Sequence, residues 1–265
     1  MNIIKRELKA NWKSTIVWIV SISAMVLAFL LMFPAFSGDV EVMKNILKNF
    51  PPAVQTALSF SFENIFTING FLAYLLTFLT LAGAIQAMNL GVGIISKEES
   101  GKTVDFLLSK PISRIRVITE KITASMFLLL VTNLVFVSVT ILVGKSVASS
   151  DFDIKTYILI IMIMPLIQLF FLSLGIIFSV VIPKIKSVIG VSLPVVFILF
   201  FIGMLSSLLD NDSLKYLSPF KYYDSNYIIE HVTFDTHFLI VEAVFVIVAI
   251  LTSYIIYIKK DTKSF

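Results

Sequence analysis

The sequence contains no cysteine and only two histidines, His231 and His237. The lack of cysteine excludes disulfides and metal sites with thiolate ligands. Charged side chains are also scarce, at 14 % of residues, whereas an ordinary soluble domain has about 25 %. Hydrophobic residues make up 58 %, and the mean hydropathy is +0.96. A chain of 265 residues has no interior large enough for so much apolar surface, so part of its surroundings must be lipid.

Six nearly charge-free runs are long enough to cross a membrane, which takes about 20 helical residues. They cover residues 14–33, 70–95, 122–143, 157–182, 188–209 and 238–258. Backbone groups in lipid must be hydrogen-bonded within their own segment, and the alternation of a membrane β-strand over about ten residues is absent. We therefore predict an all-α integral membrane protein with six transmembrane helices, forming a single membrane domain over residues 1–265.

Lysine and arginine are divided unevenly between the two sides of these predicted spans. Fifteen of the 21 lie in the N-terminal tail, the second and fourth connections and the C-terminal tail, which all fall on one side. Basic residues concentrate on the cytoplasmic side of a membrane, so both termini are expected there. The abundance of Ile, Lys and Phe is typical of an AT-rich bacterial genome, so the expected location is the bacterial plasma membrane.

The segment before the first span carries an apolar stripe formed by Ile4, Leu8 and Trp12, with the basic residues off that stripe. This pattern predicts a short amphipathic helix at the membrane interface, near anionic lipid headgroups. The alternative is a basic, frayed terminus.

Two outer connections also have patterns of their own. Residues 40–50 and 53–62 predict short helices on or in the outer leaflet. The last outer connection contains four tyrosines, which are typical of an aromatic belt at the headgroups and leave a substrate gate as the alternative. They are Tyr216, Tyr222, Tyr223 and Tyr227.

The second connection contains Gly101-Lys102-Thr103, the closing residues of many phosphate-binding loops. Such a loop also needs a glycine five residues before Gly101, where this chain has Ser96, and a preceding buried strand. Here a membrane helix precedes it, and no acidic residue at the end of a second strand is available for Mg²⁺. We therefore expect this chain to bind no ATP, metal or other cofactor itself.

The same connection predicts a short amphipathic helix. On a helical wheel Val104, Leu107 and Leu108 share one face, and charged and hydroxyl side chains share the other. Pro111 stops this helix because the residue before a proline disfavours α geometry. Ser113 can then cap the helix that continues into the third span.

The run EESGKT at 98–103, followed by LLSKPISR at 107–114, resembles the first cytoplasmic loop of the ABC-2 family of transporter permeases. That family pattern has an acidic residue, Gly-Thr, two leucines, Pro-x-Ser-Arg and a lysine at the start of the third helix, a place that Lys121 fits. Lys102, inserted between Gly101 and Thr103, is the one departure. The six spans, the amphipathic N-terminus and the long first outer connection fit the family too.

The resemblance implies a permease dimer, of two copies or two paralogues, that binds two cytoplasmic ATPase subunits, which hold the ATP and Mg²⁺. It also implies that the short helix is a coupling helix seated in a cleft of the ATPase. The residues expected to carry that contact are Glu98, Glu99, Gly101, Thr103, Val104, Leu107, Leu108, Pro111 and Arg114. The alternative is a solvated loop that merely obeys the charge rule. Lipid is the other expected contact, and nucleic acid is not a partner.

Polar residues inside the spans are few. Four amides are candidates for a cargo path: Gln86, Asn89, Asn133 and Gln168. For Gln86 and Asn89, hydrogen bonding between helices is the favoured interpretation. Glu242 is the only acidic residue in the six runs and lies near an outer end, where it is expected to reach the interface. A relay of ions is therefore poorly supported, and an apolar or amphipathic cargo fits better.

Other classes of membrane protein fit less well. An intramembrane enzyme needs convergent catalytic groups, and no such set is predicted here. A secondary transporter or channel without an ATPase stays open because Pro165 and Pro194 could break their helices. The family resemblance favours an exporter, with amphipathic peptide toxins or antimicrobial peptides ranked above lipids or drugs as cargo.

Overall fold

The computed structural model describes residues 3–38, 64–100, 113–148, 153–182, 185–209 and 211–259, and in these ranges all regular secondary structure is helical. Six helices are long: α1 (Ile3–Leu30), α5 (Ile68–Ser100), α7 (Arg114–Val147), α8 (Ile154–Val181), α9 (Val188–Leu209) and α12 (Thr236–Lys259). The short ones are α2 (Phe33–Gly38), α10 (Asp212–Lys215), the 3₁₀ helix η1 (Pro219–Lys221) and α11 (Ser225–His231).

The described chain contains six helices long and apolar enough to cross a membrane, with α1 and α2 counted together, which confirms the all-α fold and the six predicted spans. The predicted bounds were narrower than most of the helices. The third span, for example, was predicted at 122–143 and lies within α7, Arg114–Val147. The break between α1 and α2 has a local cause, because Pro34 has no N–H to donate to Leu30.

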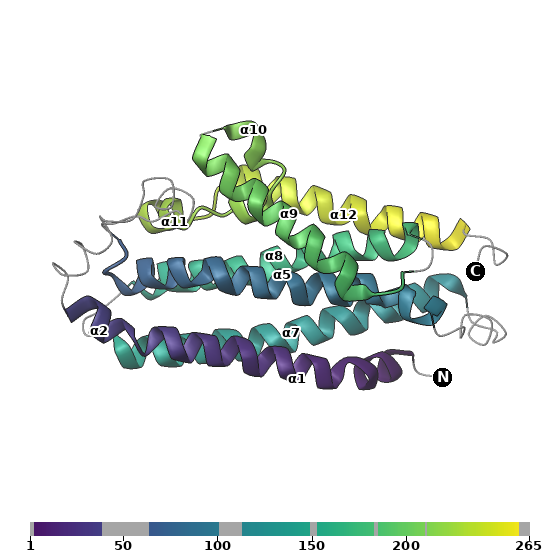
Figure 1. Cartoon of the computed structure of the whole chain (residues 1–265), viewed down its shortest axis with the longest axis horizontal. Helices are drawn as coiled ribbons and strands as arrows, with labels where there is room; N and C mark the ends of the chain where they lie inside the picture. Colours follow the sequence, from purple (N-terminus) through teal and green to yellow (C-terminus); the bar gives the residue numbers. More distant parts are fainter. Residues whose placement is uncertain are drawn as a thin grey trace.

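The long helices run side by side as an elongated bundle (Figure 1). The start of α1 and the end of α12 lie at one end, together with the end of α5 and the start of α7 (Figure 1). We call this the terminal end. Helices α2 and α11 lie at the opposite end, called the far end, and α10 lies at the edge of the bundle, nearer its middle (Figure 1).

The centre of the bundle is the contact between α5 and α8. A Cβ built on Gly91 would lie 2.5 Å from the carbonyl oxygen of Leu172 and 2.9 Å from the Cα of Gly175, so the two backbones approach closely. Leu72, Leu75 and other apolar side chains of α5 are fully buried in the core of the bundle. By contrast, α1, α9 and α12 expose broad apolar faces, which suit a lipid environment.

Both prolines that could have broken a span lie inside continuous helices. Pro165 is within α8 and Pro194 within α9. Membrane helices tolerate proline where neighbouring groups satisfy the freed backbone. The alternative of a secondary transporter with broken helices therefore loses the observation that supported it.

The predicted amphipathic N-terminal segment is helical and forms the first turns of α1, continuous with the span rather than a separate helix. Its apolar stripe is not its packed face: Trp12 is 44 % exposed, whereas Ile3, Asn11 and Thr15 are buried. The stripe therefore stays available to lipid. The predicted helices at 40–50 and 53–62 lie outside the described residues.

Candidate functional site

The connection between α5 and α7 lies only partly within the described residues. Glu98 and Glu99 occupy the last turn of α5, and Arg114 begins α7. The other predicted coupling residues lie outside the described residues: Gly101, Thr103, Val104, Leu107, Leu108 and Pro111. The coupling helix itself therefore stays a prediction, and what the structure provides is the frame on either side of it.

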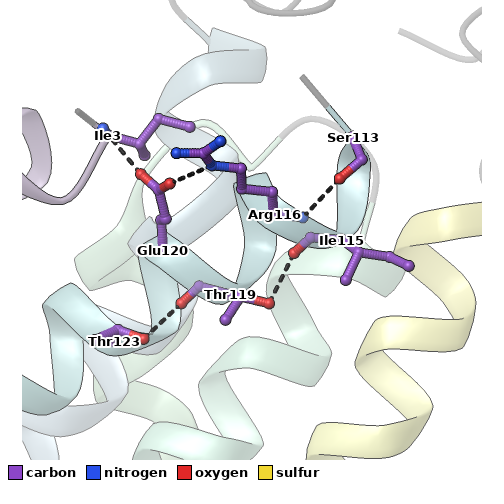
Figure 2. Close-up of polar contacts among 7 residues, drawn as sticks. All are labelled: Ile3, Ser113, Ile115, Arg116, Thr119, Glu120 and Thr123. Carbon is purple, nitrogen blue, oxygen red and sulfur yellow. Dashed lines mark hydrogen bonds and ion pairs between the residues drawn. The ribbon is translucent and has the colours of Figure 1, made fainter. Parts of the chain in front are cut away.

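The predicted cap at Ser113 is confirmed. Ser113 has extended backbone angles, φ −66° and ψ 144°, and its Oγ accepts a hydrogen bond from the backbone N of Arg116 at 3.3 Å (Figure 2). This bond satisfies one of the free N–H groups at the start of α7. The Nη1 of Arg114 donates to the carbonyl oxygen of Ile258 in the last turn of α12 at 3.2 Å, where the helix dipole favours a cation. The first turn of α7 is thus held from two sides.

Glu120 attaches the N-terminus of α1 to α7. One of its carboxylate oxygens accepts from the backbone N of Ile3 at 3.1 Å, and the other accepts from Nε of Arg116 at 2.7 Å (Figure 2). The Ile3 side chain packs against Val117 and Tyr257, next to these bonds. The amphipathic N-terminus is therefore bound to the helix that follows the predicted coupling segment.

Lys121, the lysine that fits the family pattern, lies where three helices meet. It is 1 % exposed. Its Nζ donates to the carbonyl oxygen of Ile94 on α5 at 2.5 Å and to Oε1 of Glu7 on α1 at 3.3 Å. The family pattern predicts a lysine at the start of the third helix, but it does not predict the partners of that lysine, because Glu7 lies 114 residues away along the chain.

Three of the four amides proposed for a cargo path bond to one another across helices. Nε2 of Gln86 donates to Oγ1 of Thr132 on α7 at 2.9 Å, and Nε2 of Gln168 on α8 donates to Oε1 of Gln86 at 3.3 Å. Nδ2 of Asn133 donates to Oε1 of Gln168 at 2.7 Å. Hydrogen bonding between helices is therefore confirmed for Gln86. The buried Oδ1 of Asn89 has no partner among the described residues.

The far end contains a pocket of about 450 Å³ between α5, α8, α9 and the segment from η1 to α11. One part of its lining is apolar and includes Leu76, Ile163 and Met204. Another part carries hydroxyl and charged groups, such as Ser207 and Lys221. Pockets of this size suit small ligands, and mixed walls suit a molecule with apolar and polar parts. None of the four amides named above lines it.

The segment beside this pocket turns back into the bundle. Ser218, Tyr222 and Tyr223 are buried, and Oγ of Ser218 donates to the carbonyl oxygen of Leu199 at 2.8 Å. Gly203 on α9 makes this possible, since a Cβ there would lie 2.7 Å from Oγ of Ser218. The prediction of an aromatic belt at the headgroups is therefore wrong for two of the four tyrosines. Tyr222 and Tyr223 are buried in the core.

Glu242 is also placed differently from the prediction. It is 3 % exposed and accepts a hydrogen bond from the hydroxyl of Tyr223 at 2.5 Å, so it does not reach the interface. Burial, with the Glu242 charge as a second cause, raises the pKa of Tyr223 well above its usual range. The same two causes raise the pKa of Tyr222 to about 12. Both phenols therefore stay neutral at ordinary pH.

Within the described ranges, no group of three or more His, Asp or Glu side chains is arranged to hold a metal ion. A family model described as "ABC-2 family transporter protein" matches residues 1–262. This match covers all six spans and the connection between α5 and α7. A search of curated proteins found no match.

Proposed function

The chain belongs to the ABC-2 family of transporter proteins, and on this premise we propose that it is the permease subunit of an exporter for amphipathic or hydrophobic cargo. Membership makes it a multi-pass membrane protein that works with an ABC ATPase and is not itself that ATPase. In the proposed complex, ATP and Mg²⁺ bind the partner ATPase, and this chain supplies the transport path.

The family match carries this proposal, and the geometry of the terminal end supports it. The acidic last turn of α5 and the capped first turn of α7 lie at the same end as both chain termini (Figure 1). We place the terminal end in the cytoplasm because of its excess of lysine and arginine. There the segment 101–113 would meet the ATPase through Val104, Leu107 and Leu108. The membrane would be the bacterial plasma membrane.

The nature of the cargo is inferred from the polarity of the spans. The far-end pocket combines apolar and hydroxyl-bearing side chains, and the described spans contain no pair of opposite charges in their middle. Amphipathic peptide toxins or antimicrobial peptides are the preferred class, ahead of lipids or drugs. A dimer of two copies, or of this chain with a paralogue, would complete the transport path.

The decisive experiment is co-purification of the full chain with an ABC ATPase subunit from the same organism, co-expressed with it. The wild-type chain is expected to retain the ATPase through detergent extraction and affinity purification. Leu107→Asp places a charge on the apolar face of the coupling segment and is expected to abolish that retention. The matched control is Leu217→Asp, which changes an exposed leucine just after α10, outside the coupling segment, and should leave the retention unchanged.

Two results would contradict the proposal. One is a wild-type chain that retains no ATPase. The other is a Leu107→Asp chain that retains as much ATPase as the wild type and as the Leu217→Asp control. Transport of cargo across vesicles that contain this chain but no ATPase subunit would indicate a secondary transporter instead.

A further inference from the structure

Two consecutive residues of α7 bind the first turns of α1. Glu120 accepts from the backbone N of Ile3 at 3.1 Å (Figure 2), and Lys121 donates to Oε1 of Glu7 at 3.3 Å. These bonds lie on the same side of α1, because Ile3 and Glu7 are one turn apart on a helix. The N-terminus of α1 is therefore attached to α7 at two points rather than merely resting on it.

Lys121 also reaches the third helix of this corner. Its Nζ lies 2.5 Å from the carbonyl oxygen of Ile94, whose second lone pair can accept a bond beside the one used within α5. Ile94 lies about two turns before the end of α5, and Lys121 lies about two turns after the start of α7. One ammonium group thus joins both sides of the predicted coupling segment to α1.

Lysine is an unusual residue at a position as buried as that of Lys121. Lysine is almost never fully buried without a partner, and a buried ion pair is often no more stabilising than a well-packed apolar residue. The best-attested role of such pairs is to set a unique register between packed elements. The ammonium of Lys121 satisfies both acceptors only when α1, α5 and α7 hold one mutual arrangement.

We propose that Lys121 is a positioning residue that makes the first turns of α1 move together with the ends of α5 and α7 when the ATPase acts on segment 101–113. This inference rests on the proposed function. It assigns the N-terminal segment a mechanical part in transport, in addition to its contact with lipid.

The test is hydrogen exchange measured by mass spectrometry on the full chain with its ATPase in lipid nanodiscs, with and without ATP and vanadate. In the wild type, trapping the nucleotide is expected to change exchange in residues 3–12 of α1 and in residues 114–121 of α7 together. In Lys121→Met, the α7 response should remain and the α1 response should fall several-fold. The matched control is Lys13→Met, an exposed lysine of α1 that should keep both responses.

A second variant guards against a Lys121→Met chain that does not fold. Glu7→Gln leaves Lys121 and its bond to Ile94 in place and removes only the charge that attracts α1, so it should also reduce the α1 response. If Lys121→Met folds and keeps a full α1 response, the inference is overturned. If Lys121→Met does not fold, a full α1 response in Glu7→Gln overturns it. A wild-type chain that binds no ATPase, or responds nowhere to nucleotide, would instead contradict the proposed function.

Discussion

The phenol of Tyr223 donates a 2.5 Å hydrogen bond to the buried carboxylate of Glu242 and so holds the segment that follows α10 against α12. The two residues are 19 positions apart. Phe234 packs edge-on against the Tyr223 ring, with the ring centroids 5.6 Å apart. An acidic side chain inside a membrane span is costly unless a partner satisfies it, and here the partner comes from a segment outside the spans.

Tyr223→Phe removes the hydroxyl and leaves a buried oxygen of Glu242 without its donor. We expect a loss of about 1–3 kcal/mol in the free energy of unfolding, the usual cost of an unsatisfied buried polar group. The measurement is the thermal unfolding midpoint of the purified chain. Tyr227→Phe is the control, since Tyr227 is exposed. Equal midpoints for the two variants would show that the bond to Glu242 does not hold this segment.

The raised pKa of Tyr222, about 12, predicts how stability changes in alkali. Burial makes the folded chain hold this proton more tightly than the unfolded chain, where a tyrosine titrates near 10. The resulting stability is complete below about pH 10 and is lost as pH rises from about 10 to about 12. Unfolding midpoints across this window, compared with those of Tyr222→Phe, test the sign. A stability that rises with pH more steeply in the wild type than in Tyr222→Phe would refute it.

Gly91→Ala tests the close approach of α5 and α8. The added methyl would lie 2.5 Å from a backbone oxygen of Leu172, so the helices must separate. Overpacking of this kind costs about 1–3 kcal/mol, and we expect a lower unfolding midpoint. Gly38→Ala is the control because a Cβ there meets nothing within 4 Å. If Gly91→Ala is as stable as Gly38→Ala, the two helices pack less closely than described.

A double-mutant cycle tests the bond between Gln86 and Thr132. Gln86→Leu and Thr132→Val each remove one partner, and the pair should show a coupling of about 0.6 kcal/mol, with an upper value of about 1.7 kcal/mol, as for other polar pairs in membranes. The control cycle joins Gln86→Leu with Ser253→Ala, because Ser253 bonds within α12. Those two changes should be additive. Additivity in the first cycle as well would leave Gln86 without a measurable role between helices.

Local features of this chain could be predicted because their causes are local. The six spans follow from run length and apolarity, which the thickness of a membrane imposes on any helix that crosses it. The cap at Ser113 involves a residue only three positions away, and α7 begins at the next residue, Arg114. Helix ends were less well predicted, since α5 and α7 extend beyond the apolar part of their spans.

Features that depend on distant residues were missed or placed differently. The apolar stripe of Ile4, Leu8 and Trp12 predicted which face of the N-terminus meets lipid, but not that Ile3 would bind α7. The tyrosines of the last connection fit a headgroup belt by composition, because amphipathic rings favour that level. Two of them are instead buried, since Gly203 leaves room on α9 and Glu242 supplies an acceptor.

By itself, the sequence determined that this is an all-helical membrane protein with six spans, and its EESGKT and PISR runs pointed to the ABC-2 family that the match over residues 1–262 shows. Only the tertiary structure decided which polar side chains meet, such as Lys121 with Glu7 and Ile94, or Tyr223 with Glu242. Whether a segment can cross a membrane depends on the hydrophobicity of its own residues, so it can be predicted from that segment alone. A buried polar group is satisfied by partners that packing brings from elsewhere in the chain, and periodicity does not encode them.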